Sequence, residues 1–181
     1  VDGTENPKGM HRRDVALVSS CDDATFSGGS YLHTQRYQHN LTLWNSLKNK
    51  EQEDTYGRTK VDNIEYDSAD KPLTAHTKRT NLKDENGKTI EILRQSMPYG
   101  DMKRQGLFFV SYCHSPKPFA LMLKSMIHGD GHGNVDHLLK YTQAETGAAF
   151  FAPSLTFLTE LDDNDDISES LSFKSSGLLY V

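Results

Sequence analysis

The chain has 181 residues, 35% of them hydrophobic, and a mean hydropathy of −0.66, which is polar for a self-contained globular domain. This length is enough for one domain with a hydrophobic core, or for half of a larger protein. The net charge of −5 and the lack of a basic stripe argue against a nucleic-acid partner. No run of about 18 apolar residues occurs, so neither a membrane span nor a secretory signal is predicted.

The two cysteines indicate the cellular setting, and the first residues indicate how the chain begins. Cys21 and Cys113 are far apart in the sequence, and reduced thiols of a cytoplasmic protein are favoured over a disulfide. The chain begins at Val1 and continues at once into an Asp-Gly and an Asn-Pro turn, which is typical of the interior of a domain. We therefore expect the chain to be cut from a longer protein or to be processed.

The first half of the chain predicts two strands and one helix. Strands are predicted at 14–19 and 31–36 from their apolar and branched residues. A helix of about three turns is predicted next, because apolar residues recur at helical spacing from Tyr37 to Leu47. Residues 48–75 are charged and rich in turn formers, so they are expected to form a long surface loop with one helical turn at EQEDTYGR, 51–58.

The second half gives clearer signals. Asn86-Gly87 predicts a tight turn, and 106–113 is the strongest predicted strand. Ser115-Pro116 then begins a helix that Gly129 ends. A short helix at 135–142, a buried segment at 148–158 and an acidic stretch at 160–170 complete the chain. These elements predict an α+β fold built on an antiparallel sheet.

The stretch KTIEILRQSMPYG at 88–100 places an arginine on an apolar strand face. On strand spacing, Ile90, Ile92, Arg94 and Ser96 share one face. An unpaired buried charge is costly, so Arg94 either reaches solvent at the end of the strand or faces a pocket that holds an anionic or polar group.

Four other residues are candidates that also have ordinary structural interpretations. Asp2 is either functional or a turn residue, and Asp136 is either functional or an early-helix carboxylate favoured by the helix dipole. His76 is either a ligand or a surface residue, and Arg58 either binds an anion or is one more solvated charge. None of them identifies an activity by itself.

A histidine-rich cluster at 128–137 suggests a metal site with His128, Asp130 and His132 as ligands. The cluster lacks the spacing of a zinc motif and contains no cysteine pair, so an ordinary glycine-rich loop is the favoured interpretation.

Several stretches, taken in order, resemble one known family. They are VDGTENP at 1–7, GGSYLHTQRYQHNLTLW at 28–44, GRTK at 57–60, ILRQSMPYG at 92–100, GLFFVSY at 106–112 and TGAAFFAPSL at 146–155. Together they are similar to the dye-decolourising peroxidases, and most of all to the bacterial cytosolic branch of that haem family. The resemblance implies two ferredoxin-like modules with antiparallel sheets. This chain would be the second module, with 1–160 binding haem and 161–181 forming an acidic tail outside the resemblance.

The resemblance also implies a cofactor and a role for each candidate. The cofactor is haem b (iron protoporphyrin IX), and His76 matches the proximal ligand of its iron. Asp136 falls where a carboxylate hydrogen-bonds the other imidazole nitrogen, and Arg58 falls where a haem propionate is bound. The catalytic residues on the distal side are matched by Asp2, Arg94 and Ser96, and Arg94 is also implied to contact the haem.

The implied activity is that of a peroxidase that reduces hydrogen peroxide and oxidises dye-like or phenolic donors in one-electron steps. Asp2 would move a proton, and Arg94 would stabilise developing negative charge. Two alternatives remain: a haem-binding or haem-handling protein with little turnover, and an inactive truncated module. The expected partners are hydrogen peroxide and small aromatic reductants. The apolar faces of 106–113 and 115–129 also predict a homo-oligomer or pairing with the missing first module.

Overall fold

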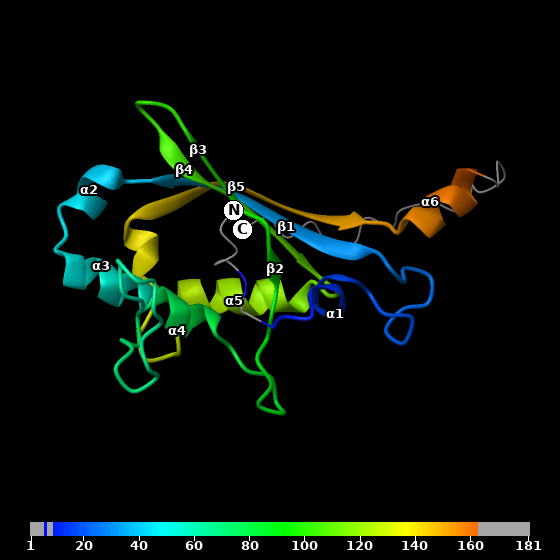
Figure 1. Cartoon of the computed structure of the whole chain (residues 1–181), viewed down its shortest axis with the longest axis horizontal. Coiled ribbons are helices and arrows are strands. Elements are labelled where there is room, and N and C mark those ends of the chain that lie inside the picture. Colours follow the sequence, from blue (N-terminus) through cyan, green and yellow to red (C-terminus); the bar gives the residue numbers. More distant parts are fainter. Residues whose placement is uncertain (1–5, 7–8, 163–181) are drawn as a thin grey trace.

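An antiparallel five-stranded sheet runs through the molecule, and α3, α4 and α5 lie on one side of it (Figure 1). The computed structural model describes residue 6 and residues 9–162. The strands are β1 (Ser30–His39), β2 (Leu93–Arg94), β3 (Met97–Gly100), β4 (Gln105–Cys113) and β5 (Thr142–Ala152). The helices are α1 (Arg12–Ala16), α2 (Leu41–Asn45), α3 (Asn49–Tyr56), α4 (His76–Thr80), α5 (Lys117–His128) and α6 (Leu155–Asp162), with a 3₁₀ turn η1 (His137–Lys140).

The strand order defines the fold as ferredoxin-like. The sheet runs β2-β4-β1-β5, and β3 continues the β2 edge by also pairing with β4. If β2 and β3 are taken as one interrupted strand, the chain follows a β-α-β-β-α-β path with two crossing helical connections. The predicted α+β class with a ferredoxin-like antiparallel sheet is therefore confirmed.

Strand register decides which residues face the helices. His33 and Arg94 both lie opposite Ser111 of β4, so all three belong to the same face of the sheet. Cys113 lies two residues after Ser111 and therefore shares this face, where it packs in the core with Phe119 of α5. The face that carries Arg94 is thus the helix-covered face.

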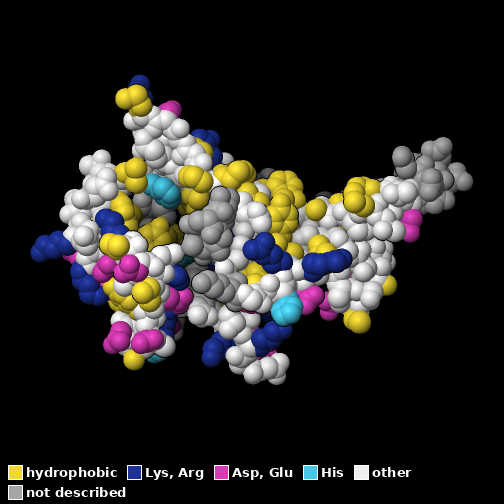
Figure 2. Space-filling view, viewed as in Figure 1, with side chains coloured by type: hydrophobic (Ala, Val, Ile, Leu, Met, Phe, Trp, Pro, Cys, Tyr) yellow, Lys and Arg dark blue, Asp and Glu magenta, His cyan; other side chains and the backbone are white. Residues whose placement is uncertain are grey.

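The opposite face of the sheet has no helix layer in the described chain. Leu32 and Tyr112 are paired there, and so are Phe108 and Met97. Phe108, Met97 and Phe150 are 37%, 56% and 55% exposed. Figure 2 shows apolar side chains gathered over the middle of the molecule, where the strands run.

The core between the sheet and α5 is small. Ile92 is 3% exposed and clusters with Cys113, Phe119 and Met122. Ile92→Ala is expected to lower the free energy of unfolding by about 3 kcal/mol, because it removes buried methyl groups and leaves a cavity. Ile64, which is 61% exposed, provides the control, and Ile64→Ala is expected to change stability by less than about 0.5 kcal/mol. Urea unfolding followed by circular dichroism measures both, and equal losses would contradict this account of the core.

Several predicted elements are confirmed. The strand predicted at 31–36 lies inside β1, and the strand at 106–113 is β4. The helix after Ser115-Pro116 is α5, which ends before Gly129 as expected. The short helix predicted at 135–142 is the 3₁₀ turn η1. Cys21 and Cys113 are both free thiols.

Other predictions are wrong. Residues 14–19 contain the end of helix α1 rather than a strand. The helix predicted from Tyr37 to Leu47 is replaced by the end of β1 and the five-residue α2. Within 48–75, which was expected to be a loop with one helical turn at 51–58, the eight-residue α3 covers most of that stretch and is longer than one turn. The segment 148–158 was expected to be buried, but Phe150 and Leu155 are 55% and 82% exposed.

Two further expectations concern the end of the chain and membranes. The expected boundary at residue 160 falls within α6, and most of the expected acidic tail lies outside the described residues. Within the described part of the chain, no helix combines the length and the apolar character needed to cross a bilayer.

Candidate functional site

A buried carboxylate and an imidazole form the centre of the candidate site. His76 Nδ1 lies 2.6 Å from Asp136 Oδ2. The Asp136 side chain is wholly buried, whereas the His76 side chain keeps 28% of its surface exposed. The two residues are 60 positions apart, so tertiary folding alone brings them together. The structure thus joins two of the residues that the sequence singled out.

The segment after α5 carries Asp136 back to α4. Gly129 ends α5 with φ at 70°, a left-handed conformation that costs glycine little. The Asp136 amide then donates to Met126 O at 2.9 Å, and the His137 amide donates to Thr74 O at 3.0 Å, just before α4. Asp136 also accepts from the Leu138 amide as the N-cap of η1. The backbone on both sides of the carboxylate is therefore fixed.

This geometry prepares the imidazole to act as a ligand. A carboxylate accepts hydrogen bonds, so Nδ1 of His76 carries the proton that it donates to Asp136. The lone pair of the ring is then on Nε2, which has no hydrogen-bond partner among the described residues. An imidazole held this way by a buried carboxylate is a fixed and strongly basic metal ligand.

One aromatic ring contacts the imidazole of His76, and a second ring packs behind the first. The ring of Tyr56 meets that of His76 edge to face, with centroids 6.2 Å apart, and Trp44 contacts Tyr56 in the same manner at 5.6 Å. Tyr56 is the last residue of α3, and Gly57 follows it with φ at 79°. A side chain at Gly57 would collide with Thr77 of α4, so glycine allows α3 to end close to His76.

A cleft of about 280 Å³ opens next to these rings. It is lined by Trp44, Gln52, Glu53, Tyr56, Arg58, Thr59, Lys60 and Asn63. Its walls combine two aromatic rings with the cationic side chains of Arg58 and Lys60 and the carboxylate of Glu53.

Arg58 lies at this cleft but already has partners. Its guanidinium donates to the side chain and carbonyl of Asn63 and to Glu65, at 2.7 to 2.9 Å. Glu65 in turn pairs with the buried Lys71. An incoming anion would share Arg58 with Glu65, so the assignment of Arg58 to a propionate remains a prediction.

A buried phenol, that of Tyr37, lies close enough to Asp136 to be affected by its charge. Tyr37 is 9% exposed, and its hydroxyl donates to Gln35 Oε1 at 2.5 Å. Burial and, to a smaller extent, the negative charge of Asp136 raise the pKa of Tyr37 to about 12. Tyr37 is therefore neutral at physiological pH.

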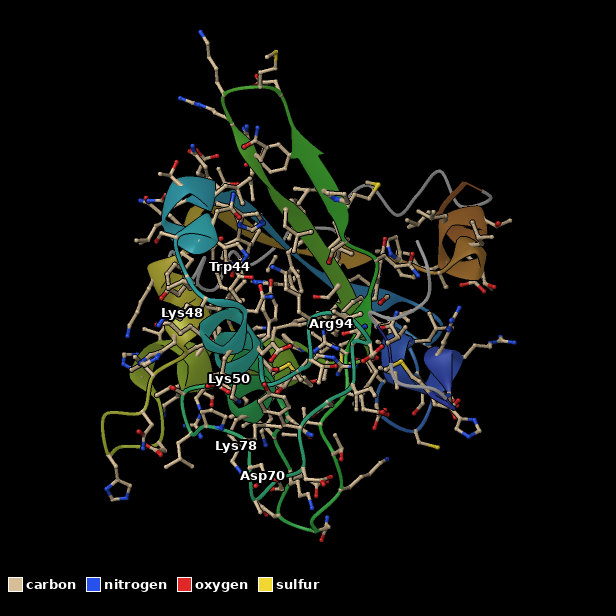
Figure 3. The ribbon with its side chains drawn as sticks, turned by 60° about the vertical axis from the view of Figure 1, so that its left-hand side comes forward. Trp44, Lys48, Lys50, Asp70, Lys78 and Arg94 are labelled. Atoms are coloured by element: carbon tan, nitrogen blue, oxygen red, sulfur yellow. The ribbon has the colours of Figure 1, made fainter. Side chains whose placement is uncertain are left out.

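The predicted distal residues lie on the sheet. Arg94 ends β2, and Figure 3 shows it beside the strands. Ser96, two residues on, is 5% exposed and accepts from the Val110 amide at 3.4 Å. Asp2 lies outside the described residues, so its role remains a prediction.

The histidine-rich loop has a structural explanation. Asp130 accepts hydrogen bonds from the His132 amide and from the Asn134 side chain, and it lies 3.8 Å from Arg79. These contacts lower the pKa of Asp130 to about 2, with the Asn134 side chain contributing most. Among the described residues no group of three possible metal ligands converges, here or elsewhere.

Two residues of the site were not singled out by their sequence pattern. Tyr56 lies just before the GRTK stretch, and its place in an aromatic and turn-rich segment was the only local signal. Asn6 lies in the VDGTENP stretch, and its side chain contacts the backbone of Arg94. Both contacts depend on long-range folding, which local sequence patterns do not specify.

The fold and site define a ferredoxin-like module in which a buried carboxylate holds a histidine. Comparison with known proteins shows the family to which this module belongs. The family model described as "Dyp-type peroxidase, C-terminal" matches residues 1–157, so the chain belongs to the Dyp-type peroxidase family and corresponds to its C-terminal part.

Similarity to proteins of known sequence and structure supports this family assignment. The chain is 41% identical over 165 residues to a dye-decolorizing peroxidase of Rhodococcus erythropolis, covering 90% of this chain and 48% of that protein. It is 65% identical to a crystal structure of a putative Dyp-type peroxidase from Shewanella oneidensis, with a TM-score of 0.84 and coverage of 88% and 52%. A DypB variant from Rhodococcus jostii RHA1 in complex with heme is 39% identical, with a TM-score of 0.79 and coverage of 85% and 50%. The chain thus spans about half the length of the relatives it matches.

Proposed function

We propose that this chain binds haem b through His76 and serves as the haem-binding module, residues 1–160, of a hydrogen-peroxide-dependent peroxidase. The observation that carries the proposal is the 2.6 Å contact between His76 and the wholly buried Asp136. Membership of the Dyp-type peroxidase family and the heme complex of a relative support it.

The residues present fit such a cofactor. Haem iron takes an axial histidine through one nitrogen, and the geometry of His76 leaves Nε2 available for that bond. Tyr56 and Trp44 offer aromatic surface next to the imidazole, and Arg58 offers a cation to an anionic substituent. When bound, haem would supply the redox-active iron that peroxide reduction requires.

The polar residues on the distal side would act on the peroxide itself. Asp2, when ionised, would accept a proton from one peroxide oxygen and return it to the other, the leaving oxygen. Arg94 would stabilise the negative charge that develops on the leaving oxygen and would favour the ionised form of Asp2. Ser96 would add a polar contact on the same sheet face as Arg94.

Reconstitution tests the proposal directly. The purified chain is titrated with haem, and the Soret band, the peroxide reaction and the peroxide-dependent oxidation of a phenol or dye are measured. A strong Soret band with turnover supports the peroxidase. A strong band without turnover supports a haem-handling protein, and no band at all contradicts haem binding by this chain.

Asp136 offers a more selective test. Asp136→Asn keeps the shape of the side chain and an oxygen for His76 Nδ1, but it removes the anionic charge behind the imidazole. We expect the variant to bind haem about 10 to 100 times more weakly and to have a higher reduction potential. Asp84→Asn, in an exposed turn, is the control. An unchanged potential in Asp136→Asn would show that the carboxylate does not tune the site.

We also propose that the chain works in the cytoplasm, paired with a first ferredoxin-like module or with a second copy of itself. The sheet face with exposed Phe108, Met97 and Phe150 supports this pairing, because such a face is costly to leave in water. Light scattering of the chain in dilute solution, with and without the first module of a relative, tests it. A stable monomer that ignores the added module would contradict the proposal.

A further inference from the structure

The side chain of Asn6 holds the backbone of Arg94 with two hydrogen bonds. Asn6 Oδ1 accepts from the Arg94 amide at 2.7 Å, and Asn6 Nδ2 donates to the Arg94 carbonyl at 2.9 Å. The two residues are 88 positions apart, and both bonds are partly buried. A side chain near the start of the chain thus binds both polar backbone groups of one strand residue.

The position of β2 explains why this contact matters. β2 forms the edge of the sheet and contains two residues, so pairing with β4 supports it on one side only. The Gln95 amide donates to Val110 of β4, and backbone groups alternate in direction along an antiparallel strand. The amide and carbonyl of Arg94 therefore point away from β4, toward the open edge.

A carboxamide has the same donor and acceptor as a peptide group. Asn6 therefore meets Arg94 as a neighbouring strand would, and it closes the sheet edge at a single residue. The direction of a strand side chain follows from its backbone, so fixing the backbone of Arg94 also limits the directions that its guanidinium can take.

We propose that Asn6 is a positioning residue that holds Arg94 for the reaction with peroxide. The proposal rests on the proposed function, because it assigns Arg94 a role on the distal side of a haem. Asn6 lies in the same VDGTENP stretch of the sequence as Asp2.

The first experiment is made without haem and measures the two hydrogen bonds between Asn6 and Arg94, which together form the clamp. Amide hydrogen exchange at Arg94 is compared, by NMR, in the haem-free parent chain, Asn6→Leu and Asn6→Asp. Asn6→Leu removes both bonds, so we expect Arg94 to exchange roughly tenfold faster while the amides of β4 are unchanged. Asn6→Asp keeps the acceptor for the Arg94 amide and is expected to exchange at an intermediate rate. Asn45→Leu, at an exposed position of α2, is the matched control and is expected to have no effect.

The second experiment measures whether Asn6 acts through Arg94. In the haem-loaded chain, Asn6→Leu is expected to slow the reaction with hydrogen peroxide by roughly tenfold, with the Soret band and haem affinity unchanged. Asn6→Asp should recover part of this loss. In the Arg94→Leu background, Asn6→Leu should cause little further loss, because residues that act as a unit are not additive.

Each result bears on the proposal. Unchanged exchange at Arg94 in Asn6→Leu would show that there is no clamp in solution. Faster exchange with an equal slowing in both the parent and the Arg94→Leu background would show that Asn6 acts independently of Arg94, and this also overturns the proposal. If the parent chain binds no haem, the proposed function fails, and the exchange measurement still decides whether the clamp exists.

Discussion

Replacing His76 with alanine is expected to abolish stable haem binding, and this is the largest effect that the structure predicts. Among the described residues, His76 is the histidine whose ring nitrogen contacts a wholly buried carboxylate. If His76 holds the haem iron as proposed, its replacement would remove the bond between protein and iron and would leave only contacts with the porphyrin. A haem titration followed by the Soret band measures the effect.

The variant needs two kinds of control. His76→Ala leaves the buried Asp136 without its partner, which is itself destabilising, so unfolding is measured in parallel. His76→Gln can still donate to Asp136 but is a poor iron ligand, so it is expected to fold and to lose haem. His128→Ala and His132→Ala change exposed residues and should leave binding intact. A normal Soret band in folded His76→Gln would remove His76 as the proximal ligand.

Local sequence patterns predicted the elements whose signals and tertiary contacts agree. β4 combines branched and aromatic residues and pairs with three other strands, and α5 begins at Ser115-Pro116 and stops at Gly129. Local sequence patterns failed where the pairing of two strands determined the structure of a segment whose apolar residues have helical spacing. Tyr37 lies opposite Leu107 and Ala144, so β1 continues beyond the point where the predicted helix would begin. The short α2 then follows in place of that helix, and Ser46, Leu47 and Lys48 separate it from α3.

Local sequence patterns indicated one residue of the candidate site and missed the contacts between the others. The spacing of Ile90, Ile92 and Arg94 correctly suggested an arginine on a covered face, because strand periodicity needs no knowledge of tertiary contacts. The His76–Asp136 pair was suggested only by family resemblance, since the two residues meet through backbone bonds that no local pattern encodes. The contact between Asn6 and Arg94 was not predicted, because a carboxamide in a turn carries no sign of its distant partner.

Arg94→Leu is expected to slow the reaction with hydrogen peroxide by about a hundredfold or more, with haem binding retained. A preorganised donor to a developing oxyanion typically contributes about 3 to 4 kcal/mol, and leucine removes that donor while it keeps an apolar side chain on the strand. Stopped-flow spectroscopy of the Soret band over a range of pH measures the rate. Arg36→Leu is the matched control, because Arg36 lies on a strand but pairs with Phe108 on the opposite face of the sheet. A hundredfold loss in Arg36→Leu as well would point to a general loss of sheet structure.

The pH dependence separates Arg94 from Asp2. Arginine stays charged throughout the physiological range, so the loss in Arg94→Leu should be nearly the same at every pH. A carboxylate accepts a proton only when ionised, so Asp2→Asn should slow the reaction most above the pKa of Asp2 and flatten the acidic limb of the rate profile. Arg94→Lys should recover part of the rate, because lysine keeps the charge but lacks the planar fork of donors. If Asp2→Asn reacts as fast as the parent at every pH, Asp2 is not the proton carrier. The charge of Arg94 would then account for the effect of the distal residues on the rate of the reaction with peroxide.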